Sequence, residues 1–260
     1  MLAESRRAAI AELLRSSGSV TVAQLEQRFG ISPMTARRDL SDLERQGLAR
    51  RTHGGAVLPA ITAHEDSFAT RLETETAAKA ALADEAVQLL APRQSVFLDS
   101  SSTAYFVARR IVQEGLAVTL ITNSQPVMEL VATSGAANIE LIGVGGTLRR
   151  LTRSYVGPFA IHTVLGHFAD RLFLSVKGIT ADGTLTDADP LEAEVKRAMI
   201  AHAEEAVLLV DHSKLATRGL SAIGPVSELT AVIAHGVPNQ ELAALRATGV
   251  TVRRAEDSGR

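Results

Sequence analysis

The chain contains no cysteine and no tryptophan among its 260 residues. The missing cysteine excludes a disulfide framework, a cysteine nucleophile and a thiolate metal site. Aromatic residues make up only 3% of the composition and hydrophobic residues 46%, so the core must be built from Ala, Val, Ile and Leu. That is enough apolar material for one large domain or for two unequal ones.

Long apolar runs and nucleotide-binding motifs are missing as well. No run approaches the roughly 18 residues that a membrane-spanning helix needs, and the first residues lack the apolar stretch of a signal peptide, so we expect a cytoplasmic protein. Neither a P-loop nor a dinucleotide fingerprint is present, and no cofactor is expected. His162 and His167 lie five residues apart without a suitably placed acidic partner, so we expect no metal site.

The charge is unevenly distributed along the chain, although the net charge is only -2. Residues 1–58 hold nine Arg or Lys and six Asp or Glu, whereas the remainder holds 18 and 23. Five of the arginines fall within residues 37–51. A basic cluster on an acidic protein is the electrostatic footprint of a phosphate backbone, although a solvated charged face would give the same pattern.

Three short helical patterns follow one another in the first 58 residues. Residues 6–15 carry apolar side chains at helical spacing. Thr21–Gln24 is typical of a capping box at the start of a helix that runs to about Phe29. After a turn of a few residues around Gly30, Ser32 and Pro33 suit the N-cap and first position of a third helix. This arrangement predicts a helix-turn-helix, whose second helix enters the major groove of DNA.

A hairpin follows the third helix. Residues 48–51 and 56–58 flank a glycine turn at 52–55, which predicts a wing. Ala36, Leu40 and Leu43 share one stripe of the third helix and should face the core. The predicted DNA-contacting side chains come from the opposite stripe and from the wing: Ser32, Met34, Thr35, Arg37, Arg38, Ser41, Arg50, Arg51 and His53.

The rest of the chain alternates between helical and strand-like segments. Residues 59–75 are predicted to form a linker with one short contact segment at 68–71, and residues 76–260 a second domain. Strands are expected at 95–99, 118–122, 139–144, 172–176, 206–211, 231–234 and 250–252, and helices at 77–90, 103–114, 126–134, 190–204 and 239–248. The fold class is therefore mainly α/β, with a mostly parallel sheet in the second domain.

Polar loops follow five of these predicted strands. They begin near Asp99, Asn123, Gly143, Lys177 and Asp211. Because ligands bind at the carboxyl ends of parallel strands, where loops expose amides and helices begin, the five loops together predict a polar pocket that accepts anions. Ordinary helix capping by Ser and Thr would explain any one of them alone.

The first domain is recognisable once these elements are in place. Residues 17–56 resemble the N-terminal domain of DeoR-type bacterial transcription regulators. The shared elements are Val-x-x-Leu at 22–25, Ser-x-x-Thr-x-Arg-Arg-Asp-Leu at 32–40 and Arg-x-His-Gly-Gly-Ala at 51–56. Ala36 stands where that family commonly has Ile, which is a change of packing.

The resemblance continues to about residue 252, because further family segments occur in the expected order at 97–103, 122–124, 145–146, 156–157, 183–187, 194–197 and 211–214. It implies an effector domain similar in fold to ribose-5-phosphate isomerase that senses a phosphorylated sugar. The effector-binding residues that it implies are Asp99, Ser100, Ser102, Thr103, Asn123, Gly146, Lys177 and Lys214. Ser101 replaces the usual Gly, and its side chain could narrow the pocket or change the effector.

The favoured function is a repressor of a sugar or carbohydrate operon. A phosphorylated sugar would release it from operator DNA, which a homodimer or homotetramer would read as half-sites. The alternative is an isomerase with an attached DNA-binding domain, for which Asp99, Asp211, Lys177 and Lys214 offer the residue types of a general base and an electrophile. Glu192 and Glu194 offer them too, but both lie in a charged helix where surface or interface ion pairs are expected. A purely structural module explains neither the wing arginines nor the loops.

Overall fold

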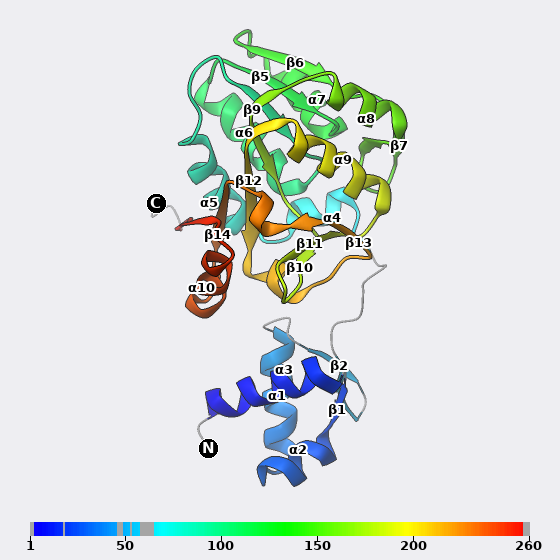
Figure 1. Ribbon diagram of the computed structural model, residues 1–260, viewed down its shortest axis with the longest axis vertical. Helices are drawn as coiled ribbons and strands as arrows, with labels where there is room; N and C mark the ends of the chain where they lie inside the picture. Colours follow the sequence, from blue (N-terminus) through cyan, green and yellow to red (C-terminus); the bar gives the residue numbers. More distant parts are fainter. Residues whose placement is uncertain (1–2, 18, 46–48, 53, 58–64, 257–260) are drawn as a thin grey trace.

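The computed structural model of the protein describes residues 3–17, 19–45, 49–52, 54–57 and 65–256. The first group of elements consists of α1 (Ala3–Ser17), β1 (Ser19–Thr21), α2 (Val22–Phe29), α3 (Pro33–Arg45), β2 (Arg50–Thr52) and β3 (Gly55–Val57) (Figure 1). The strands form an antiparallel sheet in the order β1-β3-β2. The predicted hairpin is therefore confirmed, whereas β1 was not expected.

The predicted start and end of α2 are confirmed. The Thr21 hydroxyl accepts a hydrogen bond from the Gln24 amide at 3.2 Å, and the Gln24 side chain accepts one from the Thr21 amide at 2.8 Å. Gly30 takes the left-handed conformation, with φ of 61°. Gly55 has a different role, because a Cβ at that position would lie 2.0 Å from the carbonyl oxygen of Val20. Only glycine lets β3 pair this closely with β1.

The second group is built on a seven-stranded parallel sheet. Its order is β15-β14-β12-β9-β4-β5-β6. The strands are β4 (Ser95–Leu98), β5 (Val118–Thr122), β6 (Ile139–Gly143), β9 (Ala169–Leu174), β12 (Ala203–Asp211), β14 (Ala231–His235) and β15 (Thr251–Arg254). All of their pairings are parallel. The predicted fold class is confirmed, and each predicted strand has a counterpart.

Helices cover both faces of this sheet (Figure 1). α5 (Thr76–Val87), α6 (Ser102–Glu114) and α7 (Gln125–Ser134) pack on one face, and α8 (Pro158–Leu165), α9 (Pro190–Ala201) and α10 (Asn239–Ala247) pack on the other. The cores are aliphatic, as the composition requires. Phe97 and Phe173 are the large aromatic side chains with 0% exposure among the described residues.

Several elements differ from the sequence prediction. α9 ends at Ala201 and β12 begins at Ala203, so a helix over 190–204 was wrong by three residues. The hairpin of β7 (Thr147–Arg149) and β8 (Ser154–Val156), the helix α8 and the small sheet of β10 (Gly178–Ile179), β11 (Thr184–Asp187) and β13 (Ser221–Pro225) were not predicted. These pieces are too short to carry a clear period.

A short helix lies inside the range that was expected to be a linker. α4 (Phe68–Glu73) is capped by Ser67, which precedes it. Phe68 is buried and packs edge to face against Tyr105, with the two ring centroids 5.7 Å apart. The Phe68 amide donates to the Leu151 carbonyl at 2.8 Å. Residues 58–64 lie outside the described residues. Within the described part of the chain, no helix combines the length and apolarity needed to cross a membrane.

Candidate functional site

The exposed face of α3 carries the residues that were predicted to contact DNA. Arg37 and Arg38 are exposed, and Met34 is 80% exposed although it is apolar. Ser32 and Thr35 share a hydrogen bond of 3.0 Å at the start of the helix, and Ser41 is half-buried. Together these side chains form a polar surface around an exposed methionine on the helix that the helix-turn-helix pattern assigns to the major groove.

The remaining predicted DNA contacts lie in or near the wing. Arg50 and Arg51 belong to β2, and the Arg51 side chain is exposed. The Arg51 amide donates to a carboxylate oxygen of Glu44 at 2.8 Å, which ties the wing to the end of α3. His53 lies outside the described residues, so its predicted contact stays a prediction.

Buried ion pairs and apolar contacts fix the orientation of α3. Arg6 on α1 donates to Asp39 at 2.6 Å, and Asp39 is 3% exposed. Ala36, Leu40 and Leu43 are buried, as their spacing predicted. Because one stripe of α3 is held against α1 and α2, Arg37 and Arg38 project from the opposite side.

The carboxyl ends of β4, β9 and β12 form one polar pocket with a volume of about 250 Å³. Among its walls are four of the predicted effector residues, namely Ser102, Thr103, Lys177 and Lys214. These strands are neighbours in the sheet, which is why loops that are far apart in the sequence meet there. The volume is at the small end for ligand sites and suits a small metabolite.

Further cations enter the pocket from the segment before the sheet. Arg71 on α4 and Lys79 on α5 line the same cavity. The pKa of Lys79 is lowered to about 8, because burial and the positive charges of Lys214 and Arg71 outweigh the attraction of Asp211 and Glu75. Burial also lowers the pKa of Lys214, where Lys177 and Arg71 oppose the attraction of Asp211. Carboxylates line the same cavity, namely Glu65, Asp66, Glu75, Asp187 and Asp211, so its walls carry charges of both signs.

Lys196 lines the pocket with Asp187, and it also contacts Asp99 behind the pocket wall. Its ammonium lies 2.8 Å from Asp187 and 3.0 Å from Asp99, and it donates to the Ser175 carbonyl at 2.6 Å. Burial alone would lower the pKa of Lys196, but Asp187 and Asp99 more than offset this and raise it. The Lys196 charge is thus neutralised by the protein itself.

Asp99 and Ser100, two predicted effector residues, do not line the pocket. Asp99 is 1% exposed, and its carboxylate accepts from the amide and hydroxyl of Ser101 and from the Ser175 amide in addition to Lys196. Ser100 donates to Glu192 at 2.9 Å. The Ser101 hydroxyl points to Asp99 and caps α6 through the Ala104 amide, so this extra side chain is occupied within the protein.

Asn123 and Gly146 also lie outside the pocket, on the neighbouring β5 and β6 side of the sheet. The Asn123 side-chain amide donates to the backbone carbonyl of Tyr155 at 2.9 Å, and the backbone carbonyl of Asn123 accepts from the Tyr155 amide at 2.8 Å. A Cβ on Gly146 would lie 2.7 Å from the Val156 carbonyl oxygen. Both positions therefore hold the β7–β8 hairpin against the sheet, and their role in effector binding stays a prediction.

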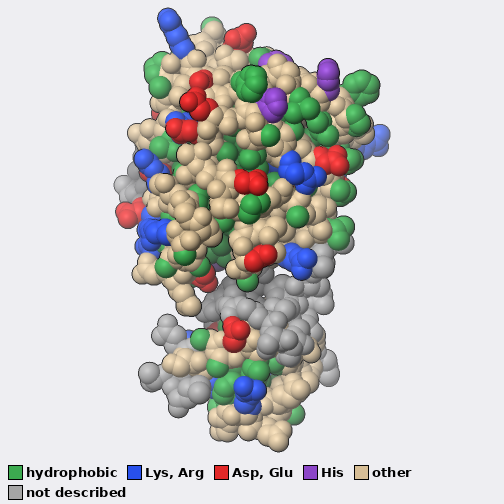
Figure 2. Space-filling view, in the orientation of Figure 1, with side chains coloured by type: hydrophobic (Ala, Val, Ile, Leu, Met, Phe, Trp, Pro, Cys, Tyr) green, Lys and Arg blue, Asp and Glu red, His purple; other side chains and the backbone are tan. Residues whose placement is uncertain are grey.

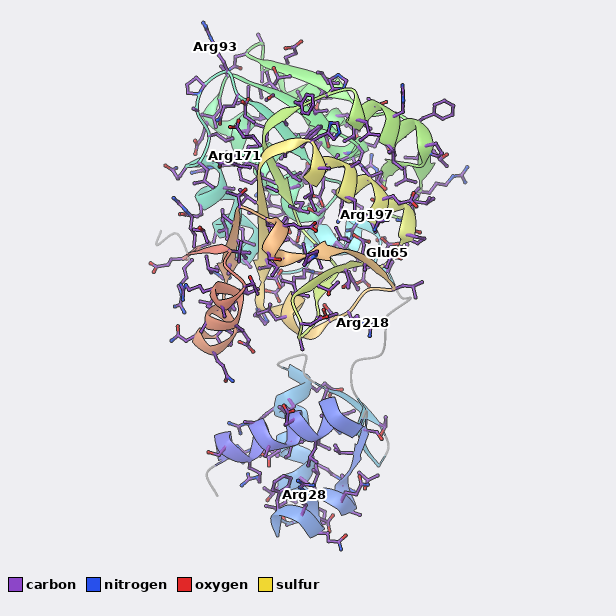
Figure 3. All side chains as sticks on the ribbon, viewed as in Figure 1. Arg28, Glu65, Arg93, Arg171, Arg197 and Arg218 are labelled. Carbon is purple, nitrogen blue, oxygen red and sulfur yellow. The ribbon has the colours of Figure 1, made fainter. Side chains whose placement is uncertain are left out.

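A buried network joins the start of α4 to the pocket loop. Arg149 forms ion pairs with Glu65 at 2.6 Å, Asp189 at 3.2 Å and Glu192 at 2.9 Å. Glu65 comes from the segment just before α4 (Figure 3). Glu192 is 3% exposed and also accepts from Ser100 and Ser154. The expected surface ion pairing of Glu192 was therefore wrong, whereas Glu194 is exposed.

Comparison with known proteins identifies both parts of the chain. Residues 6–62 match the model of the DeoR-like helix-turn-helix domain, and residues 74–235 match the model of the DeoR C-terminal sensor domain. The chain belongs to the DeoR family of transcription regulators. Its first part is thus the DNA-binding domain and its second part the sensor domain.

Individual relatives agree with the family models over nearly the whole chain. The HTH-type transcriptional regulator GlpR of Haloferax volcanii is 32% identical over 97% of this chain and 98% of its own. The L-fucose operon activator of Escherichia coli K12 is 33% identical over 88% of this chain and 93% of its own. Ribose 5-phosphate isomerase A from Methanocaldococcus jannaschii matches 55% of each chain at 22% identity, with a TM-score of 0.40; this likeness is too distant to support an argument about the site.

The sequence analysis missed Arg71, Lys79 and Lys196, which line the cavity in the sensor domain of this DeoR-family protein. Lys196 lies in the family segment 194–197, which was noted without a role. Arg71 was placed in a linker. Lys79 lies on α5, which is rich in Ala and buried on several sides, so its sequence shows no alternation between an apolar and a polar face. The signal that could have found these residues is their charge. Lys79, for example, is 4% exposed in the structure, and a lysine buried to that degree needs polar partners.

Proposed function

We propose that this regulator is a repressor of a sugar or carbohydrate operon and that a phosphorylated sugar binds in the sensor pocket and releases it from operator DNA. The observation that supports this most is the gathering of Arg71, Lys79, Lys177 and Lys214 around one small cavity. Hydroxyls of Ser102, Thr103, Ser213 and Thr217 stand beside them. A dianionic phosphoryl group offsets the repulsion between these cations, and hydroxyls suit a sugar.

The direction of the response follows the behaviour that the sequence resemblance implies, in which the effector releases DNA. For this to happen, the effector must bind the DNA-free state more tightly than the DNA-bound state. The L-fucose relative carries the name of an activator, so the sign of the response is part of the proposal and needs its own measurement.

We also propose that the pocket senses its ligand and does not turn it over. Isomerisation needs a base that can reach a substrate C–H bond. Asp99 is engaged by Ser101, Ser175 and Lys196 and does not line the cavity. Asp211 does line it, but although burial would raise the pKa of Asp211, Lys214 and the Ser213 hydrogen bonds lower it on balance, which makes this carboxylate a weak base. Lys196, in turn, is held between Asp99 and Asp187. This arrangement favours the regulator over the isomerase alternative.

Self-association is the third part of the proposal, because a helix-turn-helix reads paired half-sites as a symmetric oligomer. α8 and the turn after it expose Phe159 at 78%, Leu165 at 47% and Phe168 at 79%. Phe159 and Leu165 lie near the two ends of α8, and Phe168 lies in the turn that follows it. Figure 2 shows hydrophobic and histidine side chains gathered at the upper right, where Figure 1 places α8. We propose that this face meets a second copy of the chain.

A gel-shift experiment on the DNA upstream of the protein's own gene tests the proposal. The full chain should retard this DNA, and one member of a panel of sugar phosphates should release it, whereas the unphosphorylated sugar should not. Retardation that no sugar phosphate alters would contradict the proposed effector class. Conversion of the active compound into another sugar phosphate would instead favour the isomerase.

A further inference from the structure

The guanidinium of Arg71 lies over the Phe68 ring, with its Cζ 6.0 Å from the ring centroid, but the part of the chain that the structure describes does not use all of its hydrogen-bond donors. Its Nε and Nη2 atoms are buried without a hydrogen-bond partner among the described residues, while the side chain lines the sensor pocket. A buried guanidinium nitrogen without a partner is costly, and such groups are normally hydrogen-bonded. Arg71 thus presents unused donors of fixed geometry beside Lys79 and Lys214, which both feel its charge.

Arg71 also differs from the other pocket cations in where it comes from. Lys177 and Lys214 follow strands of the sheet, whereas Arg71 lies on α4, the first helix described after the DNA-binding domain. α4 contains six residues, of which Phe68 is buried. A helix this short has little stability of its own, so its position depends on its contacts with the rest of the sensor domain.

Those contacts lead directly to the pocket. The Lys79 ammonium donates to the carbonyls of Arg71 and Thr74, so the C-terminal end of α4 is bonded to a side chain that itself lines the pocket. At the other end, Arg149 holds Glu65 and connects it through Glu192 to Ser100 in the loop after β4. Both ends of the segment 65–74 lie at the cavity, because Glu65 and Thr74 themselves line it.

We propose that Arg71 binds the anionic group of the effector from α4, and that effector binding thereby fixes the segment leading to the DNA-binding domain. This inference rests on the proposed function, since it requires an anion in the sensor pocket. The inference adds that Arg71, the ligand contact nearest in sequence to the DNA-binding domain, communicates to that domain whether an effector is bound in the pocket. A guanidinium suits this role because it can hold two phosphoryl oxygens at once.

The test uses amide hydrogen exchange of the full chain, with inorganic phosphate as the probe. At a phosphate concentration ten times its dissociation constant, exchange in residues 66–74 should slow by about tenfold. Arg71→Met should weaken phosphate binding by about 10- to 100-fold. When phosphate is raised to ten times the new dissociation constant, exchange in residues 66–74 of this variant should stay at its phosphate-free rate.

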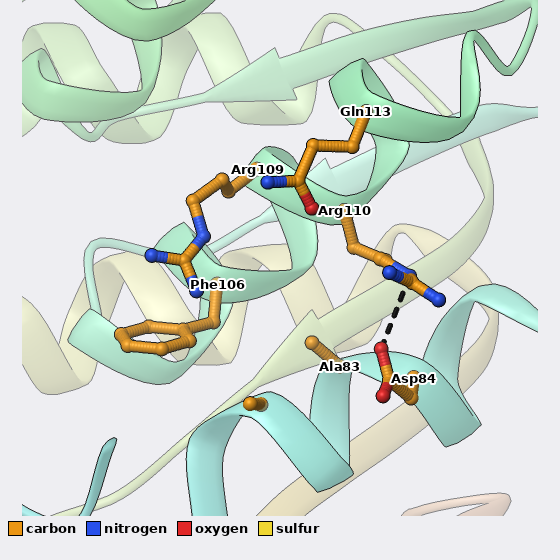
Figure 4. A pocket seen from close by; sticks show the side chains of 7 residues that line it. Ala83, Asp84, Phe106, Arg109, Arg110 and Gln113 are labelled. Carbon is orange, nitrogen blue, oxygen red and sulfur yellow. Dashed lines mark ion pairs between the residues drawn. The ribbon is translucent and has the colours of Figure 1, made fainter. Parts of the chain in front are cut away.

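Arg109→Met is the matched control. Arg109 also lies over an aromatic ring, with its Cζ 4.3 Å from the Phe106 centroid, but it belongs to a separate groove between α5 and α6 (Figure 4). This variant should bind phosphate and protect residues 66–74 as the unchanged protein does. Arg71→Lys keeps the charge without the paired donors and should retain part of the protection, which separates loss of the contact from misfolding.

The outcomes distinguish the two proposals. If the unchanged protein binds phosphate but residues 66–74 are not protected, or if Arg71→Met protects them fully at saturation, the role of Arg71 is wrong and the anion pocket stands. If the unchanged protein binds neither phosphate nor any sugar phosphate, the proposed function itself fails, and the inference fails with it.

Discussion

The ammonium of Lys196 lies 2.8 Å from a carboxylate oxygen of Asp187, and both side chains are buried beneath the sensor pocket. With Asp99 they form a group of one cation and two anions that is nearly sealed from water. Removing one member leaves the others without compensation, and this penalty is larger than the net contribution of the intact group.

Lys196→Met should therefore lower the free energy of unfolding by about 3–5 kcal/mol. Chemical denaturation of the sensor domain in the full chain would measure it. The exposed neighbour Arg197 on the same helix is the control, and Arg197→Met should cost less than about 1 kcal/mol. A loss below that value for Lys196→Met would mean that Asp99 and Asp187 do not depend on its charge. Because the pKa of Lys196 is raised, its contribution should persist through neutral and moderately alkaline pH and be lost only above the ordinary lysine pKa.

Arg38→Ala should weaken operator binding by about 1–3 kcal/mol if this exposed side chain reads a base edge. Gel-shift titration against operator and random DNA distinguishes base reading from phosphate contact, because loss of a phosphate contact weakens both to a similar degree. Arg246→Ala on α10 removes the same charge from the sensor domain and should leave both affinities unchanged. If Arg38→Ala binds operator DNA as tightly as the unchanged protein does, Arg38 does not read a base.

Anion binding should take up protons near pH 8. The pKa of Lys79 stands at about 8 because burial and the charges of Lys214 and Arg71 oppose its protonation. An anion in the pocket raises this pKa, so binding should add about half a proton at pH 8, and affinity should fall as pH rises through that value. Sulfate is a suitable probe since it does not titrate in this range.

Calorimetry of sulfate binding in buffers of different ionisation enthalpy would measure the proton uptake. Lys79→Met should reduce it, although the pKa of Lys214 is lowered as well and can supply a remainder. Binding with no uptake at pH 8 would show that the anion does not lie near Lys79.

Ser101→Gly should lower stability more than it changes effector binding. The Ser101 hydroxyl caps α6 and bonds to Asp99 at 2.5 Å. Losing both bonds should cost about 1–2 kcal/mol, whereas affinity for phosphate should change by less than about threefold because the hydroxyl is directed at Asp99. A large gain in affinity would instead mean that this side chain restricts the pocket.

Phe159→Asp should disrupt self-association if the exposed face of α8 meets a second copy. Burying a carboxylate in an apolar interface is strongly unfavourable, so sedimentation should show a smaller species, and operator affinity should fall with it. Phe159 is 78% exposed in the single chain, so the substitution should not destabilise the fold of the individual chain, and the monomeric variant should still unfold cooperatively on heating. An unchanged sedimentation profile would place the interface elsewhere.

The sequence was informative where local rules govern the structure. The capping box at Thr21 and the order of strands along the chain depend on residues close together, and these expectations were confirmed. The central strands were predictable because each is a short apolar run bounded by polar loops, which then had to share one edge of a parallel sheet.

The pocket in the sensor domain was less predictable because several polar side chains around it form hydrogen bonds and ion pairs with one another. Asp99 and Ser100 sit in the expected loop, but Lys196 and Glu192, some 90 residues later on α9, turn them away from the cavity. Arg71 and Lys79 enter it from segments that show no ligand-binding pattern. A loop motif identifies the edge of the sheet, whereas the partners of each side chain depend on long-range packing.

The parallel order of the sheet has a consequence for how the protein is made. Ser95, at the start of the inner strand β4, donates hydrogen bonds to Asp170, 75 residues further along the chain. At 5–20 residues per second, the ribosome needs about 4–15 s to supply that partner. The core of the DNA-binding domain, within residues 10–56, is complete long before then. In each new molecule the helix-turn-helix core is therefore complete before the sheet of the sensor domain can close.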